Sequence, residues 1–150
     1  MSTTALTTTA AAPAPSAPTA PSATTPPRVR IWHSTAWAQI PVDGGLVPEA
    51  IVLPLVVGYH PGDPVTMVYE YDHDPAVCPD AVVEIAEQAF RMFNDAPVSA
   101  WETAQAARYR GLGLRSLSVG DVVTVGPDAV AFRPSGCETV PGPDLGPELQ

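Results

Sequence analysis

Alternation of apolar and polar residues predicts two strands in the first half of the chain. Arg28–Ser34 alternates and places Val29 and Ile31 on one face. Val65–Tyr71 has the same period of two, because an apolar or aromatic residue occupies every second position. We expect four of its side chains to share one face of the strand, namely Val65, Met67, Tyr69 and Tyr71.

A strongly apolar segment lies between these two strands and contains a proline. Ile51–Val57 is apolar throughout, and Pro54 divides it into two triplets. Because proline has no N–H to donate to a strand ladder, we expect this segment to form an edge strand, a bulged strand or an extended arm. The segment is far too short to span a bilayer.

Apolar residues recur with helical spacing between Asp80 and Asn94, which predicts a helix over this range. The side chains expected to form its apolar stripe are Val82, Ile85, Ala86, Ala89, Phe90 and Phe93. Asp80 follows a proline and is expected to cap the first turn. Burial of the two phenylalanines and the isoleucine stabilises the fold by about 1.5–3 kcal/mol each. This helix is therefore expected to organise the core.

The pattern Ser-x-x-Glu predicts where a second helix begins. Ser99 and Glu102 have the spacing of a capping box, in which the serine side chain accepts a backbone N–H of the first turn. The helix is therefore expected to begin at Ala100. Gly111 is a natural residue to end it.

The last third of the chain predicts short strands joined by tight turns. Val122–Val125 and Ala129–Arg133 flank the turn sequence Gly-Pro-Asp and are expected to pair as a hairpin. Glu138–Val140 predicts a short closing strand. Taken together, these elements predict an α+β fold in which a small antiparallel sheet packs on one or two helices.

The two ends of the chain differ in composition from this predicted domain. Alanine, threonine, proline and serine make up 25 of residues 1–27, which carry no charged side chain. Such a segment lacks the large apolar groups that would offset the entropy cost of ordering it. We therefore expect a disordered tail over 1–27, a single domain over 28–140 and a flexible end over 141–150, which is rich in proline and glycine.

Charge and cysteine content narrow the class of protein. The chain has 7 basic residues, all arginine, against 16 acidic ones, and its net charge is −9. A phosphate backbone repels such a chain, so direct nucleic-acid binding is not expected. Cys78 and Cys137 have no metal-ligand spacing, which favours two reduced thiols in a cytoplasm. The first residues lack the basic start and apolar run of a secretory signal, and no membrane association is expected.

Two stretches of the chain resemble a known protein family. One is Ala89–Asn94, at the end of the first predicted helix, and the other is Gly113–Val123, which reads G-L-R-S-L-S-V-G-D-V-V. Together they resemble the YodL-like domain, in which a helix ending in F-x-x-F-N leads into a signature with S-L-S-V-x-D-V-V. The residues that match the helix motif are Phe90, Phe93 and Asn94.

The resemblance covers about half of the chain, from Val65 to Val140. It implies a small α+β domain of a kind found in stand-alone proteins and in proteins of plasmids, phages and other mobile elements. It implies no catalytic residues. The chain departs from the family at the last strand, where Cys137 follows Gly136 and members of the family usually have an aromatic residue.

The signature also has a physical interpretation that does not depend on the family. Its residues are Ser116, Leu117, Ser118, Val119, Gly120 and Asp121. Leu117 and Val119 are expected to point inward, while the hydroxyls of the two serines that alternate with them bond to the backbone. Asp121 is expected to accept N–H bonds from the segment before it. The motif is interpreted as a corner that specifies the fold rather than as a catalytic site.

Carboxylates and histidines provide the remaining candidates for chemistry. Glu70, Asp72 and Asp74 alternate around His73, and in an extended chain the three carboxylates would share a face that suits a hard cation. The alternative interpretation is a solvated strand end. Three histidines lie in separate segments, namely His33, His60 and His73. Their spacing matches no metal-binding motif, so we expect neither a metal nor another cofactor.

These observations favour a non-catalytic accessory or protein-binding domain that acts on a protein partner in the bacterial cytoplasm, rather than an enzyme. Trp32 and Trp37 would either form part of the partner surface or pack under Ile51–Val57. Two alternatives remain open. One is a small metal-assisted hydrolase or nuclease that uses the Glu70–Asp74 run, and the other is a structural or virion-associated protein in which the tail acts as a spacer.

Overall fold

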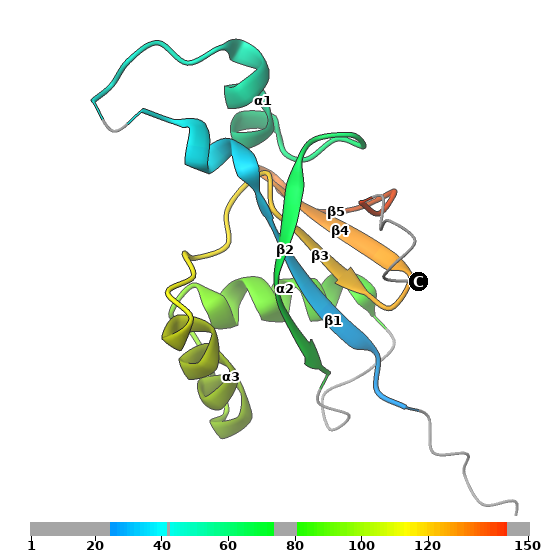
Figure 1. The fold of residues 1–150 in the computed structure, drawn as a ribbon. Helices are drawn as coiled ribbons and strands as arrows, with labels where there is room; N and C mark the ends of the chain where they lie inside the picture. Colours follow the sequence, from blue (N-terminus) through cyan, green and yellow to red (C-terminus); the bar gives the residue numbers. More distant parts are fainter. Residues whose placement is uncertain (1–24, 42, 74–80, 144–150) are drawn as a thin grey trace, which may run out of the picture.

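The computed structural model describes residues 25–41, 43–73 and 81–143, and within these ranges five strands form one antiparallel sheet (Figure 1). Its strand order is β2-β1-β3-β4-β5. The strands are β1 (Arg28–Ser34), β2 (Val65–Asp72), β3 (Val122–Val125), β4 (Asp128–Arg133) and β5 (Gly136–Val140). The predicted α+β class, the hairpin and the closing strand are confirmed. The expected tails lie outside the described residues, except for 25–27 and 141–143.

Two helices cover one face of the sheet, as Figure 1 shows. α2 (Val82–Phe93) lies against β3, β4 and β5, and α3 (Ala100–Gly111) packs against α2. All members of the predicted apolar stripe of α2 are buried or half-buried in the core between the helices and the sheet. Val29 and Ile31 of β1 face the same core, as their alternation predicted.

The N-termini of the two helices are capped in different ways. The Ser99 side chain accepts a hydrogen bond from the backbone N–H of Glu102 (3.1 Å), which confirms the predicted start of α3. The Glu102 carboxylate in turn accepts the N–H of Val98 (2.7 Å). The N-cap residue of α2 is Ala81, which makes no side-chain cap, and the expected cap Asp80 lies outside the described residues.

The predicted end of α3 at Gly111 is confirmed. Gly111 is the last helical residue, and Leu112 is the C-cap. Gly113, with a φ of +71°, takes the left-handed conformation that typically follows a helix end. A side chain at that φ would be strained, so the turn after the helix requires glycine at position 113.

A bulge in β2 makes the prediction of one shared face for its four side chains wrong. Ile31 and Trp32 are neighbours in β1, yet they pair with Tyr69 and Met67, so Val68 is an extra residue. An extra residue exchanges the two faces of a strand, because side chains alternate with a period of two. The two tyrosines of β2 therefore face α2 and α3, whereas the residues before the bulge face the opposite side of the sheet.

The apolar segment Ile51–Val57 forms a helix, so the prediction of a strand or an extended arm is wrong. Helix α1 (Glu49–Val57) contains Pro54 in its interior. A strand would need neighbouring strands for its backbone bonds, whereas this helix makes them internally and loses only the bond that Pro54 cannot donate to the carbonyl of Ala50. An apolar run of this length has no periodicity that separates the two structures.

A second cluster of buried residues lies on the face of the sheet opposite α2 and α3. It includes Trp32, Tyr59 and Val122.

A short 3₁₀ helix, η1 (Thr35–Gln39), continues directly from β1. At the other end of the described chain, Pro143 is buried. In the part of the chain that the structure describes, no helix has the length and the apolar character needed to cross a membrane.

Candidate functional site

The signature residues form a corner, residues 114–121, that Asp121 holds together. The Asp121 carboxylate is fully buried and accepts the backbone N–H of Ser118 (2.8 Å), as the sequence predicted. It also accepts the N–H of Ser34 at the end of β1 (2.8 Å), which fastens the corner to the sheet. Two nitrogens of the Arg115 guanidinium bind its two oxygens at 2.7 and 2.6 Å. Sequence reasoning missed the last two contacts, because both partners reach Asp121 only through the fold.

The corner is joined to helix α2 by the asparagine of the helix motif. The side-chain amide of Asn94 donates to the carbonyl of Leu117 (3.1 Å), and Leu117 itself is buried in the core. Phe93 stacks on Tyr109 of α3, with ring centroids 4.2 Å apart. The two stretches that carry the family resemblance are therefore in direct contact, and Asn94 and Phe93 link the helices to the corner.

Gly120 lets helix α1 approach the corner closely. Its φ is +92°, and a Cβ at this position would lie 2.7 Å from the carbonyl oxygen of Pro54. Both the conformation and the space therefore require glycine. The backbone of α1 at Pro54 therefore packs directly against this turn, and the absence of a side chain at Gly120 allows α1 this position.

A chain of hydrogen bonds runs from β1 through α3 into the corner. The Tyr109 hydroxyl donates to the carbonyl of Arg115 (2.7 Å) and lies 2.7 Å from Nε2 of His33. Because the hydroxyl has one hydrogen, it accepts from His33, whose proton is therefore on Nε2. Burial lowers the pKa of His33; Asp121 opposes this shift and Arg115 adds to it. Burial also raises the pKa of Tyr109. The hydrogen bonds of Tyr109 therefore join the corner to α3 and to β1.

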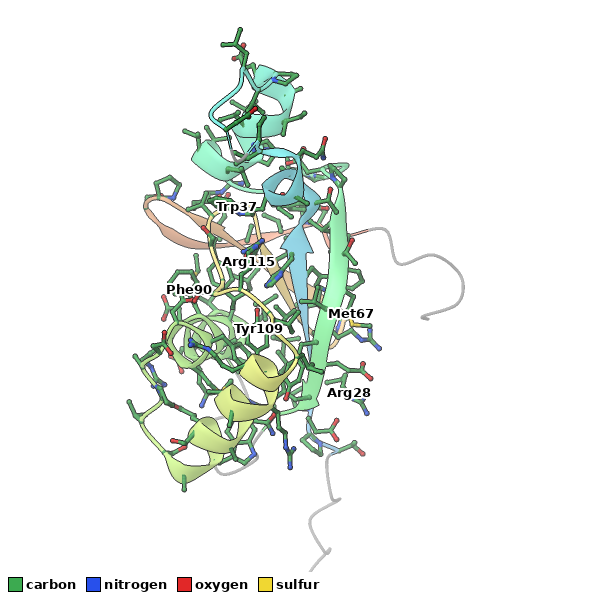
Figure 2. All side chains as sticks on the ribbon, turned by 60° about the vertical axis from the view of Figure 1, so that its left-hand side comes forward. Arg28, Trp37, Met67, Phe90, Tyr109 and Arg115 are labelled. Carbon is green, nitrogen blue, oxygen red and sulfur yellow. The ribbon has the colours of Figure 1, made fainter. Side chains whose placement is uncertain are left out.

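The two tryptophans have different environments. Trp32 is buried, and its ring N–H donates to the hydroxyl of Thr124 (3.1 Å), so it belongs to the core. Trp37 in η1 is 39% exposed, and the guanidinium carbon of Arg115 lies 5.4 Å from its ring centroid. Figure 2 shows Trp37 and Arg115 near each other, with Tyr109 on the side toward α3. Only Trp37 is available to a partner.

Exposed apolar side chains gather on η1 and α1, which contact each other. This surface, called here the apolar cap, consists of Trp37, Ile40, Leu53, Val56 and Val57. Leu53 is 45% and Val56 56% exposed. After Glu49, every residue of α1 is apolar, so the helix has no polar face to turn toward water. Figure 1 shows α1 beyond one end of the sheet, away from α2 and α3.

The apolar cap borders a small cavity, and the charged residues of its own chain segment are all acidic. The cavity of about 320 Å³ is lined by residues of α1 and of the loop that follows it: Ala50, Leu53, Pro54, His60 and Asp63. The Asp63 carboxylate accepts the backbone N–H of His60 (2.7 Å), which holds it at the rim. The sequence from 35 to 64 contains Asp43, Glu49 and Asp63 but neither lysine nor arginine.

The acidic residues of β2 are engaged by arginines of β1. Glu70 lies 3.0 Å from Arg28 and 3.3 Å from Arg30, and Asp72 lies 2.8 Å from Arg28. Asp74, the third member of the expected run, lies outside the described residues. Over 25–41, 43–73 and 81–143, no group of three or more histidine, cysteine, aspartate or glutamate side chains is placed to hold a metal ion.

The three histidines do not converge on this acidic run as a set. His33 is bound to Tyr109, and His60 lies beside Asp63, with 3.9 Å between Nδ1 and the nearer carboxylate oxygen. His73 is buried directly after β2, where its backbone N–H donates to the carbonyl of Pro27 (3.0 Å). Each histidine therefore serves a different part of the fold.

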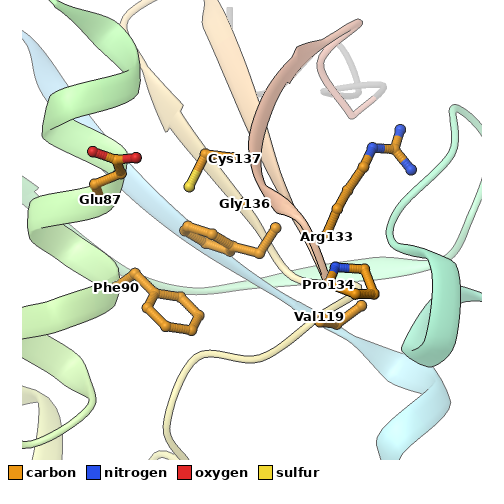
Figure 3. A pocket seen from close by; sticks show the side chains of 8 residues that line it. Glu87, Phe90, Val119, Arg133, Pro134, Gly136 and Cys137 are labelled. Atoms are coloured by element: carbon orange, nitrogen blue, oxygen red, sulfur yellow. The ribbon is translucent and has the colours of Figure 1, made fainter.

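A groove that no sequence pattern predicted lies between α2 and the β4–β5 hairpin. Its volume is about 440 Å³, and Figure 3 shows Glu87 and Phe90 of α2 on one side and Cys137 of β5 across from them. Val119, Phe132, Arg133, Pro134 and Gly136 complete the lining. Burial, and then the charge of Glu87, raise the pKa of the Cys137 thiol. The lining residues come from four separate elements, which only the tertiary structure brings together.

Comparison with known proteins gives no relative for this chain. No family model matches it, and neither a curated protein nor a solved structure does.

Proposed function

We propose that this protein is a non-catalytic protein-binding domain and that its partner docks on the apolar cap. The observation that carries this proposal is helix α1, which has apolar residues on all sides and leaves Leu53, Val56 and Val57 exposed. Exposing apolar surface costs about 25 cal/mol per Å², so exposed apolar side chains gathered on two contacting elements are typical of an interaction site.

The charges around the apolar cap specify the chemistry of the partner. Glu49 is the first residue of α1, Asp43 lies in the segment before it, and Asp63 lies at the rim of the adjoining cavity. Arg115 and Arg133 also reach the apolar cap, but each is paired with a carboxylate, that of Asp121 or of Glu138. The charge left for a partner is therefore acidic and favours positive charge on the other side of the interface. We propose that the partner presents an amphipathic helix, with leucine-like residues on one face and lysine or arginine at the border of that face.

The corner supports a scaffold role. Its buried carboxylate, Asp121, is used to bind Arg115 and two backbone N–H groups, and its glycine positions α1. On this proposal the corner holds the apolar cap in place on the sheet. The resemblance to the YodL-like domain and a cytoplasmic location in a bacterium or one of its mobile elements remain part of the proposal, since they agree with such an accessory role.

The proposal is tested with a synthetic helical peptide as the probe. A labelled peptide of about 18 residues, or about five turns, carries leucine and lysine at helical spacing, and a second peptide has glutamate in place of every lysine. Fluorescence anisotropy of each peptide is measured against the full chain. The leucine–lysine peptide should bind, and Leu53→Ser with Val56→Ser should weaken it by at least about tenfold, or about 1.4 kcal/mol.

A matched control removes exposed apolar groups elsewhere. Val98 and Leu112 are exposed outside the apolar cap, and Val98→Ser with Leu112→Ser should leave binding unchanged. Equal binding of the glutamate peptide, or wild-type binding by the Leu53→Ser, Val56→Ser variant, would overturn the proposal. Sedimentation equilibrium provides a second check: a dimer that the same double variant dissociates would make the occupant a second copy of the chain, which also contradicts a basic partner.

A further inference from the structure

The outer edge of β5 has backbone groups that face away from the sheet. In the described residues β5 pairs only with β4, so it is one of the two edge strands. Phe132 of β4 uses its N–H and its carbonyl to bond Asp121 and Gly120 on the β3 side (3.4 Å each). Its partner across the hairpin, Cys137, is therefore in a non-hydrogen-bonded pair, and its own backbone groups point outward. Thr139, two residues further along β5, also has its backbone groups pointing outward.

This edge forms one wall of the groove described above. Cys137 lines the groove from β5, and Phe90 and Phe132 pack against each other at its base, with ring centroids 4.7 Å apart. In Figure 3 the Cys137 side chain points to the same space as Phe90. An open edge beside an apolar groove between a strand and a helix is the arrangement that admits one more strand, because backbone bonds hold the added chain and the groove takes its alternate side chains.

The other edge strand, β2, has more protection from such an addition than β5, whose one charged residue is Glu138. β2 contains the bulge at Val68, and ion pairs with Arg28 and Arg30 occupy its acidic end. Bulges and charged residues are devices that keep an edge from pairing. β5 is regular over its whole length, and its register with β4 has no shift.

The charge at the groove selects the peptide. Glu87 stands on the helical wall and, among the described residues, forms no ion pair. Arg133, at the far end, is already held by Glu138 and by the carbonyl of Val57 (3.0 Å). The available charge in the groove is therefore negative, and it lies beside an apolar base. A peptide that fits would carry an apolar side chain and, on the same face, a basic one.

We infer that the β5 edge and this groove bind an extended peptide segment as a sixth strand of the sheet. The apolar side chain of the segment enters the groove against Phe90 and Phe132, and a lysine or arginine two residues along it faces Glu87. The site is separate from the apolar cap and does not depend on the function proposed for it.

The test uses a defined peptide, acetyl-Thr-Thr-Leu-Thr-Lys-Thr-amide, in which leucine and lysine share one face. Binding to the full chain is followed by NMR, with the amides of Cys137 and Thr139 as reporters. The same peptide N-methylated at leucine cannot donate to the edge and should bind at least about tenfold more weakly. A version with lysine moved next to leucine, on the opposite face, should also lose affinity. Equal binding of either version contradicts strand addition.

Two variants of the chain make the test specific. The Glu87→Lys variant should bind the lysine peptide more weakly and the glutamate counterpart more tightly. Asp128→Lys, which changes the exposed first residue of β4, should leave the binding of both peptides unchanged. Thr139→Pro removes an outward N–H that β4 does not use and should abolish binding. If Thr139→Pro fails to fold, the N-methylated peptide decides the same point on the wild-type chain.

The result of the extended-peptide test can be distinguished from the result of the helical-peptide test on the apolar cap. The Leu53→Ser, Val56→Ser variant should bind the extended peptide as the wild type does, because neither residue lines the groove. Peptide-induced shifts confined to α1 and absent from β5 would overturn the inference, as would binding that does not respond to Glu87→Lys.

Discussion

Helices α1 and α2 are both largely apolar, yet one is exposed and the other is buried. α2 has its apolar side chains on one stripe, and the sheet covers that stripe. α1 has apolar side chains all round, and one layer of neighbours cannot cover them all. Amphipathic spacing therefore produced a core helix, while uniform apolarity left an exposed apolar surface.

The corner connects these two regions and holds them differently. Asn94 joins it to the end of α2 by a hydrogen bond, and Gly120 lets the backbone of α1 lie directly on it. Side-chain contacts between α2 and the sheet are extensive, whereas α1 depends on a few close approaches. Damage to the α2 side should therefore unfold the domain, and damage to the α1 side should mainly affect docking.

Removal of Phe93 should have the largest effect. Its side chain is fully buried and contacts aromatic rings on α3 and β2, so Phe93→Ala should lower the free energy of unfolding by about 3–5 kcal/mol. Urea denaturation followed by circular dichroism measures this change. Leu53→Ala on α1 is the matched control, and a comparable loss there would mean that the two helices contribute equally to the core.

Removal of the Asp121 carboxylate should rank next. Asp121→Ala leaves the guanidinium of Arg115 without its partner and two backbone N–H groups, of Ser34 and Ser118, without an acceptor. We expect a loss of about 3 kcal/mol, at the lower end for a broken buried pair because Arg115 reaches solvent. The same denaturation experiment on Asp128→Ala, at the exposed start of β4, should show a loss of less than about 0.5 kcal/mol.

Substitution of Gly120 should separate α1 from the rest of the molecule. Gly120→Ala forces a side chain into a positive φ and against the carbonyl of Pro54, at a cost of about 1–3 kcal/mol. We expect hydrogen exchange to accelerate in α1 while the amides of α2 stay protected. Gly113→Ala, whose Cβ would meet open space, is the control for the φ effect alone. Uniform acceleration in both helices would contradict a corner that serves α1 in particular.

Acidification should produce the smallest effect, through His33. Because burial lowers its pKa in the folded chain, the unfolded chain binds more protons between that lowered value and 6.5. The stability contributed by His33 is therefore complete above 6.5 and is lost as the pH falls below it. Between about pH 7.5 and 5.5 the wild type should lose more stability than His33→Gln. An equal pH dependence of the two urea midpoints would contradict this.

Glu102 affects the stability only at a lower pH than His33 does. The hydrogen bond from Arg91 is the main cause that holds the pKa of Glu102 below its ordinary 4.5. Protonation of Glu102 therefore removes stability only as the pH falls below 4.5, since a lowered carboxyl pKa favours the folded state above it. A loss of stability in wild type that begins above pH 5 is thus attributable to a group other than Glu102.

Much of the fold was predictable because local signals agreed with the tertiary structure. The stripe of α2, the Ser99 cap of α3 and the hairpin after Val122 each depend on residues close in the sequence. The predictions that failed depended on distant neighbours. A bulge in β2 arises from its pairing with β1, and α1 is a helix although its apolar run has no periodicity.

The candidate surfaces were less predictable than the fold. Trp37 was identified as a candidate partner residue, but its paired candidate Trp32 is part of the core, because a residue's exposure depends on what packs over it. The groove at Cys137 combines residues from α2, the corner and two strands. Nothing in the spacing of these residues along the chain indicates that they meet.

By itself the sequence determined the class of the fold, the amphipathic helix, the capped helix and the role of Asp121 as an acceptor at the corner, because these follow from periodicities and hydrogen bonds over a few residues. The tertiary structure alone decided that Ile51–Val57 is helical and leaves Leu53, Val56 and Val57 exposed. It also decided that β5, within the described residues, pairs only with β4 and borders an apolar groove. The physical reason is that burial and strand pairing depend on the free energy of contacts between segments that are remote in the chain, and a local pattern does not contain those contacts.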